Sequence, residues 1–247
     1  MRKLLPAHLI PVNPATGRPL SGGFFCVAKK NKKQLRLIFD RRPQNATERR
    51  LHWLRLPNAG MLRHFVLGPR EVLRGSGSDI EVYFFRLEHE DSWVKHNAAG
   101  TPVTGRWLEE FGISNWWEPH FVCMAVWWMG DINSADVAGY VHERILEGSG
   151  VLHDRNRLEY GKPIPACRVI VGVYLDDLLV LGRVTASAHF GGKKLEDESL
   201  YERSLQSYAE ARLALSEGKS FVKELKFEAW GAEVDGAEGA VACPAAH

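Results

Sequence analysis

Two adjacent aspartates, Asp176 and Asp177, are the residues of this sequence best suited to chemistry. They lie between two short apolar runs, in the stretch R-V-I-V-G-V-Y-L-D-D-L-L-V-L-G over residues 168–182. Each run has the length of a strand and the break between them is short, so the pattern predicts a β-hairpin with both carboxylates at its tip. Neighbouring carboxylates suit a hard divalent cation such as Mg²⁺. The alternative is an ordinary turn, where aspartate is common.

The elements that position these acids belong to a globular chain. Its 247 residues are 45% hydrophobic and 25% charged, which allows one sizeable domain or two subdomains. No apolar run approaches the length of a membrane span, and the N-terminal residues do not resemble a signal peptide. The cysteines lack a paired spacing, which indicates reduced thiols and an intracellular location, cytoplasmic or nuclear. They are Cys26, Cys123, Cys167 and Cys243.

Charge is distributed unevenly along the chain. Residues 1–74 carry sixteen Lys/Arg against three Asp/Glu, a net +13, whereas the remainder carries sixteen against twenty-seven, a net −11. A basic first third on a nearly neutral chain favours a surface that binds a polyanion such as nucleic acid. A solvated basic face without a partner is the alternative.

The residues Tyr174-Leu175-Asp176-Asp177 resemble the Y-x-D-D motif of reverse transcriptases, which lies between two strands of the polymerase palm. The resemblance implies that both aspartates bind catalytic Mg²⁺ and that Tyr174 contributes to nucleotide binding. One short motif has little specificity, so the other elements of the family need to be present in the same order.

The fingers of this family are matched by residues 24–45. Strands are predicted at 24–28 and 35–39, on either side of a basic turn at 29–33. The pattern R-x-x-x-D-x-R-x-x-N then falls on Arg36, Asp40, Arg42 and Asn45. By resemblance, Lys29 and Arg36 contact the triphosphate of the incoming nucleotide, and Asp40 and Arg42 pair with each other or with neighbouring residues. The alternative is a surface strand with an Arg/Asp ladder.

The next segment resembles polymerase motif A. We expect a helix over residues 59–73, a break at 75–78 and a strand over 79–87 that opens with Asp79. The resemblance makes Asp79 the first metal ligand and Phe84 the aromatic residue beneath the sugar. The sequence departs from the family at Tyr83, where Ala or Gly is usual. A turn acid that caps a strand is the alternative for Asp79.

Motif B of the family is matched by a glycine before a helix. Residues 121–129 are strongly apolar, and a helix capped by Asn133 or Ser134 is predicted to extend to about residue 146. Gly130 matches the family glycine, where backbone can approach a ligand closely. Met129 and Asp131 depart from the family pattern. A plain buried helix is the alternative.

After a loop at 147–167 and the hairpin, a helix is predicted over residues 196–217. The resemblance to motif D places Lys219 near the leaving pyrophosphate, and an exposed loop lysine is the alternative. A strand with W-G follows, as in the family.

These matches imply an α+β fold: a polymerase palm, with an antiparallel sheet and helices on one face, plus a β-rich basic fingers subdomain, without a thumb. The predicted division is an extended lead-in at 1–23, fingers-like residues 24–74, a palm-like part at 75–236 with an insertion at 147–167, and a tail at 237–247. A missing thumb suggests a fragment of a longer polyprotein or a degenerate copy.

The predicted function is an RNA-directed DNA polymerase of a retroelement. It uses two Mg²⁺ ions, with Mn²⁺ as a substitute, and takes dNTP and an RNA or DNA template–primer as partners, without a membrane. The predicted metal ligands are Asp79, Asp176 and Asp177. Two alternatives stay open: an inactive remnant of this fold that binds nucleic acid, and a metal-dependent nuclease.

Overall fold

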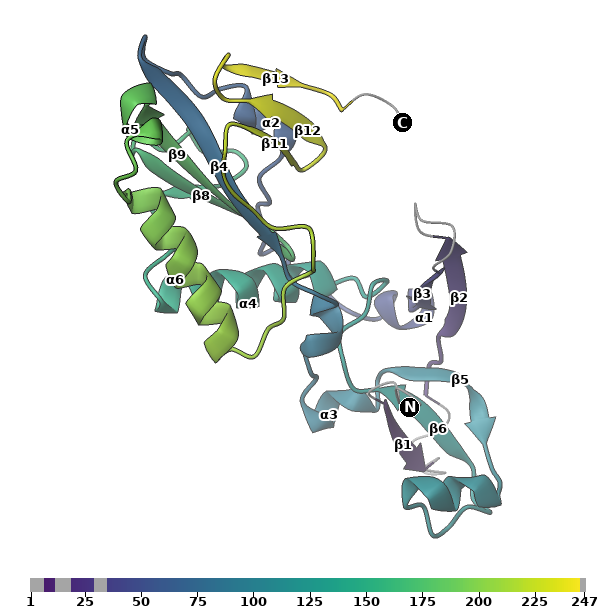
Figure 1. The fold of residues 1–247 in the computed structure, drawn as a ribbon. Helices are drawn as coiled ribbons and strands as arrows, with labels where there is room; N and C mark the ends of the chain where they lie inside the picture. Colours follow the sequence, from purple (N-terminus) through teal and green to yellow (C-terminus); the bar gives the residue numbers. More distant parts are fainter. Residues whose placement is uncertain (1–6, 12–18, 29–34, 245–247) are drawn as a thin grey trace. The chain divides into compact units, whose positions relative to one another are not determined.

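The computed structural model describes residues 7–11, 19–28 and 35–244. The chain divides into two compact units, each built from two separate segments (Figure 1). The first unit comprises Met1–His52 and Val82–Asp136, and the second comprises Trp53–Glu81 and Val137–His247. The predicted functional subdomains at 24–74 and 75–236 stay a prediction. Within the described residues, no helix is long and apolar enough to cross a bilayer.

The second unit is built on a five-stranded sheet. Its strands are antiparallel except for the parallel pair β7 and β8. The nearly continuous burial of residues along β8 and β9 fits a sheet covered on both faces. In spatial order the strands are β10 Phe221–Glu224, β4 Glu71–Asp79, β9 Asp177–Thr185, β8 Val169–Tyr174 and β7 Arg157–Leu158.

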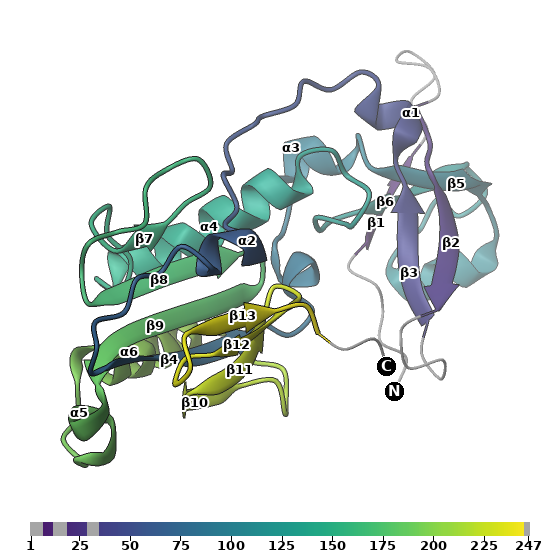
Figure 2. The ribbon, with the colours of Figure 1, turned by 90° about the horizontal axis from the view of Figure 1, so that it is seen from above.

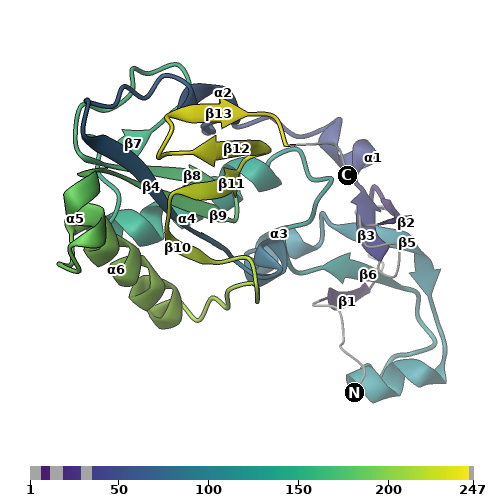
Figure 3. The same ribbon diagram turned by 45° about the horizontal axis from the view of Figure 1, so that its top comes forward.

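Helix α6 (Glu196–Glu210) packs on β4 and β9, and helix α4 (Ser134–Gly148) is hydrogen-bonded to it. The opposite face of the sheet is covered by β11 (Lys226–Ala229), β12 (Ala232–Asp235) and β13 (Ala240–Ala242), which form a separate antiparallel sheet (Figures 2 and 3). The core between the two sheets includes Leu73, Leu179, Leu181, Phe227 and Val234.

A buried ion pair fixes α6 to the sheet. Arg74 of β4 donates from Nε to Asp197 Oδ2 at 2.7 Å and from Nη2 to Asp197 Oδ1 at 2.8 Å. A third bond runs from Arg74 Nη2 to Glu198 Oε1 at 2.8 Å. Arg74 is 1% exposed and Asp197 2% exposed, so this bidentate pair is fully enclosed.

The structure corrects the prediction for residues 59–87. The helix is a single turn, α2 Ala59–Leu62, and the expected break at 75–78 is the centre of β4. Gly75 and Gly77 are required there because a Cβ would lie 2.8 Å from Phe227 and 2.5 Å from Phe221. Asp79 therefore ends a strand rather than opening one, and a 3₁₀ turn, η1 Tyr83–Arg86, follows.

Two other predictions for the second unit are refined. Helix α6 ends at Glu210 instead of continuing to residue 217, and Arg212 has a left-handed φ of 56°. The residues that follow Glu210 run past the end of β4, where the Glu81 N–H donates to the Ala214 carbonyl at 2.8 Å. The predicted helix after Gly130 is confirmed as α4.

The first unit contains two small sheets. Strands β2 (Gly23–Ala28) and β3 (Leu35–Asp40) pair antiparallel, which confirms the predicted strands, while the predicted basic turn and Lys29 lie outside the described residues. The other sheet has the order β1 (Ala7–Pro11), β6 (His120–Met124) and β5 (Ala98–Val103). Short helical turns complete the unit: α1 Arg42–Asn45, α3 Asp91–Val94 and η2 Arg106–Phe111.

Candidate active site

The three predicted acids meet at one end of the five-stranded sheet. Strands β8 and β9 form the predicted hairpin, with Tyr174 paired with Asp177 across a two-residue turn of Leu175 and Asp176. On the other side of β9, Asp177 is the register partner of Asp79 at the end of β4. Residues directly opposite in an antiparallel pair have side chains on the same face. The expected meeting of Asp79 with the hairpin tip is therefore present.

The loop between α6 and β10 holds Asp79 in place. Lys219 Nζ donates to Asp79 Oδ2 at 2.7 Å, and Ser216 Oγ donates to Asp79 Oδ1. The Ser216 N–H also donates to the Asp79 carbonyl at 2.8 Å. Lys219 is thus ion-paired with Asp79, while its predicted place near the leaving pyrophosphate stays a prediction. Nothing in the sequence marks Ser216, because serine is common in polar loops.

The close approach of the acids changes the titration of Asp177. Burial, the negative charges of Asp176 and Asp79 and a hydrogen bond with Asp79 together raise the pKa of Asp177 to about 7, against an opposing effect of Lys219. The hydrogen bond to Asp79 raises the pKa of Lys219. Asp177 keeps its proton to a higher pH than an ordinary aspartate and must lose that proton before its carboxylate can bind a cation.

We expect this raised pKa to make stability depend on pH. The folded protein binds the Asp177 proton more tightly than the unfolded chain, so the stabilisation is complete below about pH 4 and is lost as pH rises through 7. In urea denaturation with a chelator present, the wild type should lose roughly 1 kcal/mol relative to Asp177→Asn between pH 5 and pH 8, after allowance for solvent screening.

Asp154→Asn is the matched control, because Asp154 is an exposed aspartate of the same unit. Its stability should follow the wild-type pH profile. A parallel profile for Asp177→Asn would contradict the coupling of Asp177 to its neighbours.

The three aspartates supply carboxylate oxygens, the type of donor that suits a hard cation. Among the described residues, no three His, Cys, Asp or Glu side chains form a ready metal-binding group. Carboxylate oxygens are nevertheless the ligands that Mg²⁺ prefers, and the pKa of Asp177 is raised first by burial and then by the negative charges of Asp176 and Asp79, which a bound cation would offset. The carboxylate oxygens of Asp79, Asp176 and Asp177 are the donor type that Mg²⁺ or Mn²⁺ binds. An ion that uses Asp79 competes with Lys219 for it.

Tyr174 lies beside the acids as the last residue of β8. Its ring packs against Trp230, in the turn between β11 and β12, with centroids 6.3 Å apart. The hairpin strand and the covering sheet thus meet at the end that carries the acids.

The remaining predicted nucleotide contacts belong to the first unit. Arg36 is an exposed residue of β3, and Phe84 is half-buried in η1. Tyr83, whose bulk departs from the family pattern, is only 1% exposed, so its ring is part of the core. Asp40 and Arg42 form the predicted pair, with Arg42 Nη2 2.6 Å from Asp40 Oδ2.

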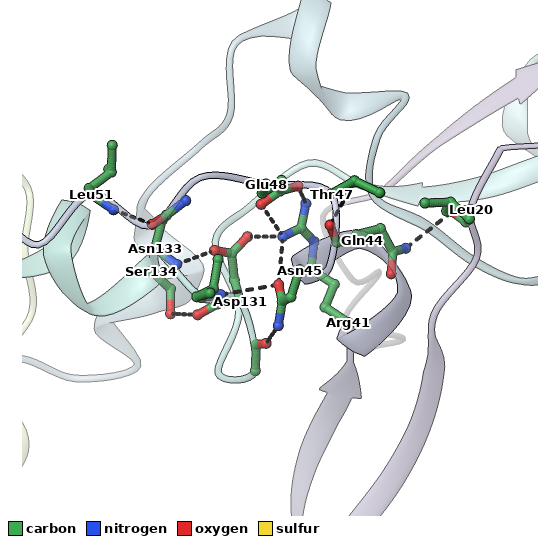
Figure 4. Close-up of polar contacts among 12 residues, drawn as sticks. Leu20, Arg41, Gln44, Asn45, Thr47, Glu48, Leu51, Asp131, Asn133 and Ser134 are labelled. Atoms are coloured by element: carbon green, nitrogen blue, oxygen red, sulfur yellow. Dashed lines mark hydrogen bonds and ion pairs between the residues drawn. The ribbon is translucent and has the colours of Figure 1, made fainter.

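Asp131, another residue that departs from the family pattern, belongs to a buried polar network (Figure 4). Arg41 Nη1 lies 2.6 Å from Asp131 Oδ2 and donates to Glu48 Oε2 at 2.9 Å. Asn45 Nδ2 donates to the Gly130 carbonyl at 2.8 Å. Burial raises the pKa of Asp131, and the Arg41 charge opposes this. The network ties the loop before α4 to α1, a role that spacing alone does not reveal.

Gly130 approaches backbone, as predicted, but the neighbour is part of this chain. Its φ is +115°, and a Cβ would lie 2.2 Å from the Phe39 carbonyl oxygen. We expect Gly130→Ala to lower the free energy of unfolding by about 2–3 kcal/mol, because both the φ and the contact become unfavourable. Urea denaturation measures this loss.

Gly100→Ala is the matched control, since Gly100 also has a positive φ of +70° but nothing within 4 Å of its Cβ position. It should cost about 1 kcal/mol. Equal losses in the two variants would show that the contact with Phe39 relaxes.

Comparison with known proteins gives the class of fold. No protein-family model matches the chain, and no curated protein sequence matches it. Solved structures do match, and they show a reverse transcriptase-like fold.

One is the foamy viral protease-reverse transcriptase dRH in complex with double-stranded DNA, with a TM-score of 0.59, 16% identity and 93% of this chain covered. Another is the native prototype foamy virus protease-reverse transcriptase, with a TM-score of 0.54, 17% identity and 92% covered. The chain spans 31% and 23% of the length of these two.

Proposed function

We propose that this chain is an RNA-directed DNA polymerase domain that adds nucleotides to a primer end with two Mg²⁺ ions. The observation that most supports this is the pairing of Asp79 with Asp177 beside Asp176, in a chain with a reverse transcriptase-like fold. In this proposal the five-stranded sheet of the second unit is the palm, and the β2–β3 hairpin belongs to the fingers. Bound Mg²⁺ supplies Lewis acidity for the primer 3′-hydroxyl and for the leaving pyrophosphate.

The residues of the chain divide the remaining work. The three aspartates hold the ions, and Asp177 must be deprotonated to do so. Lys219 is kept protonated by Asp79, which raises its pKa, and it can donate to the pyrophosphate oxygens.

Nucleotide and nucleic acid are proposed to bind through cationic and aromatic groups. Lys29 and Arg36 contact the triphosphate, Phe84 lies beneath the sugar, and Gly130 and Tyr174 contact the incoming nucleotide. The basic first third binds the RNA or DNA template–primer through phosphate contacts, so affinity falls with added salt. The complexes of foamy viral neighbours with double-stranded DNA support this partner.

Primer extension on an RNA template with Mg²⁺ and dNTP tests the proposal. The wild type should incorporate dNTP, and Asp176→Asn should abolish incorporation. Asp154→Asn, an exposed change in the same unit, should extend at the wild-type rate. No incorporation by the wild type, with Mg²⁺ or Mn²⁺, would rule the activity out.

A second candidate is a nucleic-acid-binding domain of the same fold without catalysis. It is favoured by the engagement of both Asp79 carboxylate oxygens by Ser216 and Lys219. Template–primer binding without extension would support it. Degradation of the primer would point instead to a metal-dependent nuclease.

A further inference from the structure

A buried histidine and a buried tyrosine contact the turn that carries the acids. His142 of α4 is 0% exposed and Tyr208 of α6 is 1% exposed. His142 Nδ1 lies 2.6 Å from the Leu175 carbonyl oxygen, and His142 Nε2 lies 2.7 Å from the Tyr208 hydroxyl. A continuous chain of two hydrogen bonds therefore runs from α6 through α4 to the hairpin turn.

The direction of each bond follows from its partners. A carbonyl oxygen only accepts, so His142 donates from Nδ1–H, and Nε2 accepts from the Tyr208 hydroxyl. Burial lowers the pKa of His142 to about 4, which keeps the imidazole neutral at physiological pH. Tyr208 thus selects the tautomer that can donate to Leu175.

The turn needs such support. Leu175 has a φ of 56°, a left-handed conformation that is unfavourable for a residue with a Cβ. The next carbonyl, that of Asp176, accepts from the Ile80 N–H at 2.9 Å. Both carbonyls of the two-residue turn are therefore bonded, one to α4 and one to the residue that follows Asp79.

We infer that His142 and Tyr208 are positioning residues, which hold the Leu175–Asp176 turn so that Asp176 and Asp177 lie opposite Asp79. Neither residue lies in a sequence motif of the proposed activity. This inference rests on the proposed function for its catalytic consequence. Its structural part concerns the turn alone.

Three changes separate this role from general packing. His142→Leu removes the donor to Leu175, whereas the side-chain amide of His142→Asn can still donate in the position of Nδ1. Tyr208→Phe removes only the hydroxyl. Tyr201→Phe is the matched control, because Tyr201 is also buried on α6 and donates to the carbonyl of Gly77 in β4, at 2.9 Å.

The first readout needs neither metal nor activity. Hydrogen exchange of the Ile80 amide, which bonds the Asp176 carbonyl, should accelerate about tenfold in His142→Leu and Tyr208→Phe relative to Tyr201→Phe. His142→Asn should stay within about threefold of the wild type. Equal exchange in Tyr208→Phe and Tyr201→Phe, or equal effects of Leu and Asn at position 142, would overturn the inference.

The second readout is Mn²⁺ affinity, measured by magnetic resonance without nucleotide or nucleic acid. Tyr208→Phe should weaken Mn²⁺ binding about tenfold, and Tyr201→Phe should not. In primer extension, Tyr208→Phe should lower kcat and leave the KM for primer unchanged. If the wild type extends no primer, the polymerase proposal fails, while the exchange of the Ile80 amide still decides whether the turn is held by His142 and Tyr208.

Discussion

Primer extension by Asp79→Asn should fall about 10³-fold if Asp79 is a metal ligand of the proposed polymerase. The change keeps the shape of the side chain but removes the negative charge opposite Asp177. A lost metal ligand is worth several kcal/mol in the transition state, and about 4 kcal/mol corresponds to 10³ in rate. Single-turnover incorporation of one dNTP at saturating Mg²⁺ measures the loss.

Stability separates this effect from damage to the fold. Asp79→Asn gives up the ion pair with Lys219 but also removes the repulsion from Asp177, so its free energy of unfolding should stay within about 1 kcal/mol of the wild type. Extension at more than a tenth of the wild-type rate would show that Asp79 is not a metal ligand.

The largest effect on stability is expected at the buried ion pair between Arg74 of β4 and Asp197 of α6. Asp197→Ala should lower the free energy of unfolding by about 3–5 kcal/mol, because it leaves the buried Arg74 guanidinium without its bidentate partner. The remaining bond from Arg74 to Glu198 satisfies one N–H direction only. Urea denaturation at neutral pH measures the loss.

Two controls bracket this result. The double variant Arg74→Met with Asp197→Leu removes both charges and should recover most of the stability, since an apolar pair of similar size avoids the desolvation cost. Glu202 lies on the same helix as Asp197 and forms an exposed ion pair with Lys194, which precedes the helix. Glu202→Ala breaks this pair and should cost about 0.5 kcal/mol at most. A loss near 1 kcal/mol in Asp197→Ala would mean that water reaches Arg74.

Local sequence patterns were sufficient where one rule decided the structure. Two short apolar runs around a polar break predicted the β8–β9 hairpin, and a capped apolar stripe predicted α4. The stretch Gly75–Ser78 was misread as a break, because glycines at a strand centre make sense only once Phe221 and Phe227 lie against them. That packing partner is far along the chain.

The site was predictable in part for the same reason. Asp176 and Asp177 are recognisable from the sequence because they lie in a short motif. Their proximity to Asp79 was expected from the order in which the motifs of the family follow one another. Ser216 and His142 do not mark themselves, since their roles depend on a loop and two helices that meet only in the folded chain. The buried ion pair of Arg41 and Asp131 could likewise not be predicted from the charges along the sequence, because the two residues meet only in the folded chain.

The interleaving of the two units has a practical consequence for dissecting the protein. The chain passes from one unit to the other three times, after residues 52, 81 and 136. No single truncation therefore yields either unit intact, and a minimal fragment that carries the three acids requires residues 53–81 to be spliced to residues 137–247 through a designed linker. A nick at one crossover would likewise sever the polypeptide without freeing a complete unit.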